Sequence, residues 1–483
     1  MSNAPMPLLE AMLKYAQEQV YPLHTPGHKG GRGMAPQLCE QLGPSVVMDV
    51  SLMSELDDIH EPETYIKAAQ DRAAAVYGSD KCFWAVNGTS QAIQAMLMTA
   101  LSPGDKLLLP RNAHRSVAGG LILGGIEATY IAPEYLSAFG IHSQVTPKAI
   151  EEALDKDPAI KAVLVTSPNY YGIAADLKTI AGLCHKRRVV LLVDEAHGPH
   201  LGFSKLLPAS ALASGADACA QSTHKILGAM TQCSMLHVQG ARLDLQRAAD
   251  VMSILTTTSP NYLLMASLDA ARAQVEAKGE SMAEAALKAA EALRQILKSF
   301  AGLRVLEAED CGKLALDRTK VTVNVSGWGY TGIQVGEALR QAGIAVELVD
   351  SCNVLFLVTY ADAHEDFSLA LEKIKGVFQR LEAARGSEAS QPRPEPMPVT
   401  SSALGLRQVF YAPKKSIPLE AAIGEICGEQ VSFYPPGIPV LLPGELITRE
   451  IITYCQYMKG LGLPVSGPAD SSLEKLRIVR RVD

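Results

Sequence analysis

A carboxylate, an imidazole and an amine lie close to the ends of two apolar segments of this sequence. Asp194 closes the run VVLLVD, and His197 follows three residues later. Lys225 follows the run DACAQS, in the string STHK. Two chemistries fit these residue types: a strand end that holds magnesium in a DEAH-type helicase, or a carboxylate and an amine that serve an organic cofactor.

The sequence lacks the phosphate-binding loop that a nucleotide hydrolase needs. A P-loop needs the pattern GxxxxGK[ST], and no such string occurs in the chain. The segment GGRG (30–33) does not have the GxGxxG spacing of a dinucleotide site and follows no apolar run. The net charge of -7 also argues against a dedicated nucleic-acid binder. We therefore expect no nucleic-acid partner.

The alternative is pyridoxal phosphate, which needs a phosphate cradle, a carboxylate at its ring nitrogen and a lysine. The loop NGTSQ places Gly88, Thr89 and Ser90 between an apolar run and a helical pattern, where backbone amides and hydroxyls can hold phosphate. An ordinary helix cap is the alternative for this loop. Asp194 and Lys225 supply the other two groups, and a desolvated lysine favours imine chemistry. A helix-capping role for the aspartate and a surface position for the lysine are the alternatives.

No metal site is expected. The nine cysteines include no CxxC pair, and we interpret them as reduced and mostly buried. A cluster of Asp194, Glu195, His197 and His200 is disfavoured because successive side chains at a strand end point apart.

Nine strings along nearly the whole chain match one family in order. They are HTPGHKGG (24–31), LDDIHEP (56–62), NGTSQAIQ (87–94), RNAHRS (111–116), SPNYYG (167–172), VDEAHGPHLGF (193–203), STHKILGAMTQCSMLH (222–237), TTTSPNYLLMASLD (256–269) and YPPGIPVLLPGE (434–445). On these strings the chain resembles the pyridoxal phosphate-dependent ornithine/lysine/arginine decarboxylases of aspartate-aminotransferase fold. It is similar to their short form, which begins at the arm that precedes the cofactor domain.

The resemblance implies a role for each matching residue. Lys225 would carry the cofactor, Asp194 would keep its ring nitrogen protonated, and His114 would stack on the ring. His197 would lie near the ring substituents, with a packed core histidine as the alternative. The phosphate-binding residues would be Gly88, Thr89, Ser90, Ser222 and His224. The family also implies a homodimer in which residues from Thr257 to Tyr262 reach the partner's cofactor.

The reaction implied is loss of the α-carboxyl group of a basic amino acid, with arginine to agmatine preferred. Lysine and ornithine are alternatives, as is transamination, and a noncatalytic protein would be expected to lack Lys225 or Asp194. The proton donor to Cα stays open among Lys225, His224 and a residue of the third domain. We expect Glu445, with Asp57 or Asp58 of the partner's arm, to bind the distal cation of the substrate. The alternative for Glu445 is a solvated cap of the following helix.

Alternating apolar runs and helical patterns must position these groups. Short apolar runs at 106–110, 161–166, 189–194 and 217–222, separated by helices, predict a mostly parallel sheet covered on both faces. The expected fold class is α/β, of the pyridoxal phosphate-dependent transferase type (fold type I). The expected domains are an N-terminal arm (1–60), a cofactor domain (61–279), a small α/β domain (280–385), a proline-rich linker (386–403) and a C-terminal α+β domain (404–483).

The composition is that of a folded globular protein. The chain has 483 residues, 48% of them hydrophobic and 20% charged, which fits two or three domains. The first residues lack the basic and apolar regions of a secretory signal, and no apolar run reaches the length of a membrane span. We therefore expect a cytoplasmic protein with no membrane partner.

Overall fold

The computed structural model describes residues 4–18, 20–51, 53–385, 396–398, 400–433 and 438–480. The chain divides into two compact units. The first consists of Met1–Ala100 and Val190–Met282, and the second of Leu101–Val189 and Ala283–Asp483. The predicted domain boundaries stay predictions. Residues 386–395 and 399 of the predicted linker lie outside the described residues.

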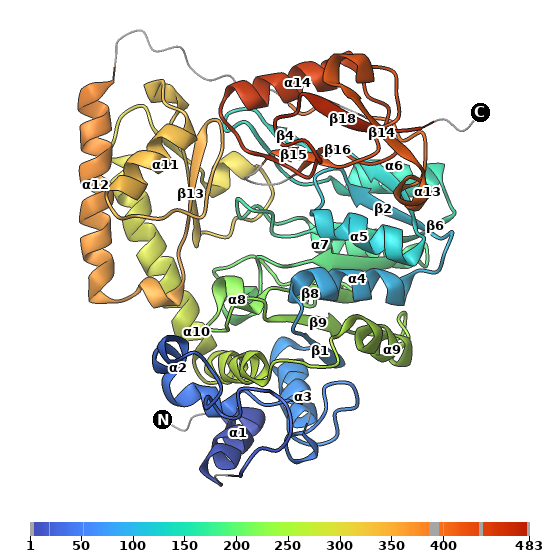
Figure 1. The fold of residues 1–483 in the computed structure, drawn as a ribbon. Coiled ribbons are helices and arrows are strands. Elements are labelled where there is room, and N and C mark those ends of the chain that lie inside the picture. The colour runs from blue at the N-terminus through green and yellow to red at the C-terminus, as the bar shows by residue number, and fades with distance from the viewer. Residues whose placement is uncertain are drawn as a thin grey trace. The chain divides into compact units, whose positions relative to one another are not determined.

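The first unit contains four strands and the helices around them (Figure 1). The strands lie in the order β1 (Lys81–Ala85), β9 (Ser234–Val238), β8 (Ala218–Gln221) and β7 (Val190–Asp194). β7 and β8 pair in parallel, whereas β9 pairs antiparallel with both β8 and β1. The helices are α1 (Pro7–Gln17), α2 (Pro36–Leu42), α3 (Tyr65–Tyr77), α4 (Gly88–Ala100), α8 (Thr223–Ile226), α9 (Leu245–Leu255) and the first part of α10 (Tyr262–Lys298).

The strands expected at 189–194 and 217–222 are confirmed as β7 and β8, and their bounds differ by at most one residue at each end. β7 and β8 are buried almost throughout, as expected for apolar strands with both faces covered. Helix α3 ends at Tyr77, and its C-cap Gly78 adopts a left-handed conformation with φ of +77°. The carboxyl ends of β7 and β8 therefore lead directly into the strings DEAH and STHK.

The second unit contributes three parallel strands in the order β6 (Ile160–Thr166), β2 (Lys106–Pro110) and β3 (Glu127–Ile131). Three helices connect or follow them: α5 (Arg115–Gly124), α6 (Pro147–Lys156) and α7 (Leu177–Lys186). A short hairpin of β4 (Tyr135–Leu136) and β5 (Ile141–His142) lies between β3 and α6 along the chain. This part of the chain agrees with the predicted parallel α/β pattern.

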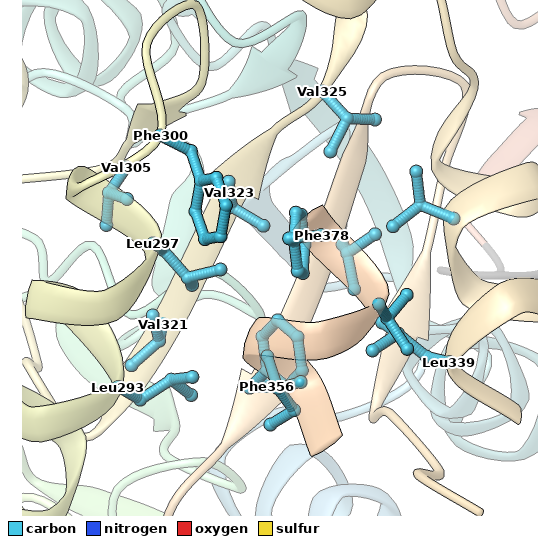
Figure 2. Close-up of a cluster of buried hydrophobic side chains, with 14 of the residues drawn as sticks. Leu293, Leu297, Phe300, Val305, Val321, Val323, Val325, Leu339, Phe356 and Phe378 are labelled. Carbon is cyan, nitrogen blue, oxygen red and sulfur yellow. The ribbon is translucent and has the colours of Figure 1, made fainter. Parts of the chain in front are cut away.

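A small antiparallel sheet follows in the second unit, in the order β10 (Arg304–Val305), β11 (Lys320–Asn324), β13 (Asn353–Leu357) and β12 (Leu348–Val349). The end of α10 packs on it with α11 (Gly332–Gln341) and α12 (Glu365–Ala384). Figure 2 shows Phe300, Val323 and Phe378 in this cluster, and the ring centroids of Phe300 and Phe378 are 5.8 Å apart. Helix α10 runs through Tyr262–Lys298, so the predicted domain boundary after residue 279 falls inside it.

The C-terminal part of the second unit has the predicted α+β character. β14 (Lys414–Pro418) pairs with β18 (Lys475–Val479), and β15 (Val431–Phe433) pairs with β16 (Pro439–Leu441) and β17 (Val465–Ser466). The helices are α13 (Leu406–Tyr411) and α14 (Arg449–Gly460). Across the described parts of both units, no helix is long and apolar enough to span a bilayer.

Candidate active site

Lys225 and His197 meet in the first unit, at the carboxyl ends of two parallel strands. Lys225 lies half-buried in the single turn α8 that follows β8, and His197 is buried three residues beyond the end of β7. The Lys225 Nζ is 3.0 Å from the His197 Nε2. A protonated amine can donate to this nitrogen only when Nε2 carries no proton of its own. The amine is therefore held in a defined place by an imidazole.

Asp194 is the last residue of β7, and its side chain is 2% exposed. Its Oδ1 accepts a hydrogen bond from the Ala196 backbone N–H at 3.1 Å. Asp194 pairs with Ala220 across the parallel strands, five residues before Lys225. Ligands of open α/β sheets bind at this edge, and a buried carboxylate acts strongly on a cation placed there.

Two hydroxyl groups meet at the N-terminus of helix α4. Thr89 Oγ1 and Ser222 Oγ are hydrogen-bonded and buried, and Gly88 begins the helix with φ of +79°. Ser90 is exposed on the same turn. The first backbone N–H groups of a helix have no partner within it, so together with the hydroxyls they can bind an anion. The structure thus brings together three of the predicted phosphate-binding residues with Ser222.

His224 is bound to the backbone of the residue that precedes β9. Its Nδ1 lies 2.8 Å from the carbonyl oxygen of Cys233, so Nδ1 carries the proton and donates. Burial lowers the pKa of His224, the Cys233 contact raises it, and the neighbouring Lys225 lowers it again. The net direction of the pKa shift is downward, which favours a neutral ring with Nε2 as an acceptor.

Thr257 belongs to a loop that forms hydrogen bonds to other parts of the first unit. Its carbonyl oxygen lies 3.2 Å from His60 Nε2, and His60 Nδ1 lies 3.0 Å from Ser253 Oγ. The neighbouring Thr256 accepts a hydrogen bond from Gln91 of α4 at 2.6 Å. Neither Gln91 nor His60 was predicted from the sequence. The string NGTSQ did carry a signal, because Gln91 lies four residues after Asn87 and accepts from its backbone N–H at 3.0 Å.

Asp57 binds the backbone at the start of helix α3. Its side chain is buried, and its oxygens accept from the backbone N–H groups of Glu63, Thr64 and Ile66 at 2.9 Å each. These groups lie at the start of α3, so Asp57 caps that helix. Asp58 accepts from the backbone N–H of His60 at 2.9 Å. Their predicted contact with substrate in a second subunit stays a prediction.

Glu445 is buried in the second unit and bound by its own chain. Its Oε2 pairs with Arg111 Nη2 at 2.7 Å and accepts from the Leu442 N–H at 2.7 Å, and Thr400 donates to Oε1 at 2.6 Å. The alternative of a solvated cap is wrong, because Glu445 is 2% exposed and Thr448 caps α14. The predicted substrate contact stays a prediction. In this geometry a substrate cation would have to compete with Arg111.

His114 also lies in the second unit, at the N-cap of α5. Its Nδ1 accepts from the Ser116 N–H at 3.2 Å, which places the ring proton on Nε2. The predicted stacking of this ring on a cofactor stays a prediction. Among the residues for which the structure gives positions, no group of three or more His, Cys, Asp or Glu side chains could hold a metal ion.

The chain matches two protein-family models. Residues 6–315 match the major domain of the ornithine/lysine/arginine decarboxylases, and residues 388–463 match their C-terminal domain. Arginine decarboxylase of Bacillus subtilis (strain 168) is 39% identical over 99% of both chains. Arginine decarboxylase of Bacillus anthracis is 38% identical over 99% of this chain and 98% of the relative.

Solved structures show the same fold. The lysine decarboxylase LdcF of Francisella novicida superposes with a TM-score of 0.83 at 22% identity, over 99% of this chain and 82% of that one. Lysine decarboxylase A of Pseudomonas aeruginosa gives a TM-score of 0.84 at 21% identity, over 98% and 80% of the two chains. The predicted α/β fold class is therefore confirmed.

Proposed function

Because the chain belongs to the ornithine/lysine/arginine decarboxylase family, we propose that it is a carboxy-lyase that converts L-arginine to agmatine and carbon dioxide. The single observation that carries the chemistry is the placement of Lys225 beside His197, at the strand edge where Asp194 ends β7. Full-length similarity to arginine decarboxylases supports arginine as the substrate.

The residues of the first unit fit pyridoxal phosphate. The hydroxyls of Thr89 and Ser222 meet at a helix N-terminus, which suits a phosphate, and the buried Asp194 carboxylate suits a protonated ring nitrogen. Lys225 is a half-buried amine of the kind that binds this cofactor covalently. When bound, pyridoxal phosphate supplies a conjugated ring that accepts the electron pair left by the departing carboxyl group.

Each side chain of the site has a task in this chemistry. Asp194 keeps a proton on the ring nitrogen, since a buried carboxylate stabilises an adjacent cation. Thr89 and Ser222 orient the cofactor through its phosphate, with His224 beside them. His197 positions the Lys225 amine through the 3.0 Å contact. The donor of the proton to Cα is Lys225, His224 or a residue of the C-terminal part.

We propose that the working form is a homodimer. Seven large apolar side chains of the N-terminal arm are more than 40% exposed in the single chain: Leu13, Val20, Tyr21, Leu23, Leu38, Leu42 and Val47. Exposed apolar surface of this extent is typical of an interaction site.

A cytoplasmic location is supported by the nine cysteines, all of which are free thiols that a reducing compartment preserves.

The proposal is tested by offering the purified protein equal concentrations of arginine, lysine and ornithine with pyridoxal phosphate. Agmatine as the dominant amine supports the proposal. Cadaverine or putrescine in excess would assign lysine or ornithine instead. Formation of a 2-oxo acid without carbon dioxide would favour transamination.

A further inference from the structure

Glu195 directly follows Asp194 and is a buried carboxyl group that the proposed reaction does not use. Its side chain is 0% exposed. Oε1 accepts from the Ala211 backbone N–H at 2.7 Å, and Oε2 accepts from Gln221 Nε2 at 2.8 Å. The thiol of Cys219 is a further hydrogen-bond partner. Both oxygens of the carboxyl group are thus hydrogen-bonded to groups of the first unit.

Among the described residues, this carboxyl group forms hydrogen bonds to an amide, a backbone N–H and a thiol and has no cationic partner, and the negative charge of the adjacent Asp194 acts on it. Buried carboxyl groups normally have a cationic partner, because an unpaired charge in the interior is strongly destabilising. Glu195 therefore differs from Glu445, which pairs with Arg111.

Besides Asp194, four titratable groups on the neighbouring elements are neutral: Cys219, Cys82, Tyr77 and His237. Burial raises the pKa of the Cys219 thiol on β8, the Cys82 thiol on β1 and the Tyr77 hydroxyl at the end of α3. Burial lowers the pKa of His237 on β9 to about 3. None of these groups can offset a negative charge on Glu195.

The balance favours a proton on Glu195 below about pH 7. Burial raises its pKa to about 7, and the Asp194 charge acts in the same direction, against the hydrogen bonds from Gln221, Ala211 and Cys219. A neutral carboxyl group avoids two adjacent buried negative charges. Asp194 can then be the one charged carboxylate at this strand end.

The bond between Glu195 and Gln221 joins the two strand ends that carry the site. Glu195 follows Asp194 at the end of β7, and Gln221 precedes Ser222 at the end of β8. We propose that Glu195 is a positioning residue that carries a proton in the folded protein and, through Gln221, fixes the spacing between Asp194 and Ser222. The spacing matters because these two residues would hold opposite ends of one cofactor, and this step alone rests on the proposed function.

The proton is tested by infrared spectroscopy of the purified full-length protein below the raised pKa. The wild type is expected to show the carbonyl band of a buried protonated carboxylic acid, and Glu195→Gln is expected to lose it. Asp217→Asn is the matched control, because Asp217 is also 2% exposed but pairs with Arg242 at 3.1 Å. A carbonyl band of the same intensity in Glu195→Gln as in the wild type would overturn the proposal.

The positioning role is tested by the affinity for pyridoxal phosphate. In Glu195→Gln the new amide can still bond to Gln221, whose Oε1 has no hydrogen-bond partner among the described residues. We expect Glu195→Leu to weaken the affinity for pyridoxal phosphate about tenfold, because a tenfold change in Kd corresponds to the loss of about one hydrogen bond. Glu195→Gln is expected to recover most of this affinity. Equal affinity of wild type and Glu195→Leu would overturn the positioning step. Failure of the wild type to bind the cofactor would instead overturn the proposed function, while leaving the infrared result intact.

Discussion

The hydroxyl groups of Thr89 and Ser222 are hydrogen-bonded to each other, although 133 residues separate them in the chain. The contact joins the first turn of α4 to the end of β8. Two hydroxyls and a helix N-terminus at one point form an arrangement suited to a phosphate group. Ser222 lies three residues before Lys225, so the same strand end carries this hydroxyl group and the amine.

Removing one of these hydroxyls is expected to weaken cofactor binding. Ser222→Ala loses a hydrogen bond to a charged group, which contributes about 1.5–3 kcal/mol, so the Kd for pyridoxal phosphate should rise about tenfold to a hundredfold. Thr223→Val is the matched control, because the neighbouring Thr223 hydroxyl has no partner among the described residues. Titration of the apoprotein measures both values, and an unchanged Kd in Ser222→Ala contradicts the phosphate role.

Asp194→Asn is expected to lower kcat by at least about a hundredfold without unfolding the protein. The neutral amide has the same shape but cannot keep the ring nitrogen protonated, and preorganised charges of this kind contribute about 3–4 kcal/mol to catalysis. Steady-state kinetics with arginine and a thermal melt of each protein separate the two effects. Turnover close to that of the wild type would remove Asp194 from the mechanism.

Glu445→Gln is expected to destabilise the protein by roughly 3 kcal/mol or more. The substitution leaves Arg111 buried without its carboxylate, and breaking one partner of a buried ion pair has a cost of this size. Chemical denaturation of Glu445→Gln, Arg111→Gln and the double variant measures the coupling between the two residues. A loss of kcat/KM for arginine with no loss of stability would return Glu445 to the predicted substrate role.

His237 gives the folded protein a defined sensitivity to acid. Burial lowers its pKa to about 3, whereas the unfolded chain binds a proton near the ordinary value of 6.5. Between these values the unfolded state binds more protons, so stability falls as the pH falls, by up to about 1.4 kcal/mol per pH unit. His237→Asn should reduce this slope. An unchanged slope in denaturation experiments from pH 6.5 to 4 would contradict the assignment.

Much of the strand pattern could be predicted because it is a local property of the sequence. The segments that form β6, β7 and β8 are continuous apolar runs, and the polar residues at or just after the ends of β7 and β8 indicated Asp194 and Lys225 as site residues. The start of α10 was missed, although Asn261 marks it by accepting from the Leu264 N–H at 3.2 Å. An asparagine before an apolar segment is a recognised start signal.

The side-chain partners could not be predicted, because they depend on tertiary contacts. Arg111 and Glu445 are 334 residues apart, and Gln91 and Thr256 are 165 apart. Glu445 was predicted to bind the substrate cation, with a solvated helix cap as the alternative, and only the fold shows that a guanidinium already binds it. Asp57 was predicted to contact the substrate from the partner's arm, and the sequence did not show that the backbone N–H groups at the start of α3 use it as a cap.

The central claim is that the chemistry takes place at the Lys225 amine, where pyridoxal phosphate is bound covalently. The direct measurement is reduction of the cofactor-loaded protein with borohydride, followed by digestion and mass spectrometry of the peptides. We expect the reduced cofactor on Lys225 in the wild type and on no peptide of Lys225→Ala, which should also be inactive. A cofactor found on another lysine of the wild type would contradict the claim.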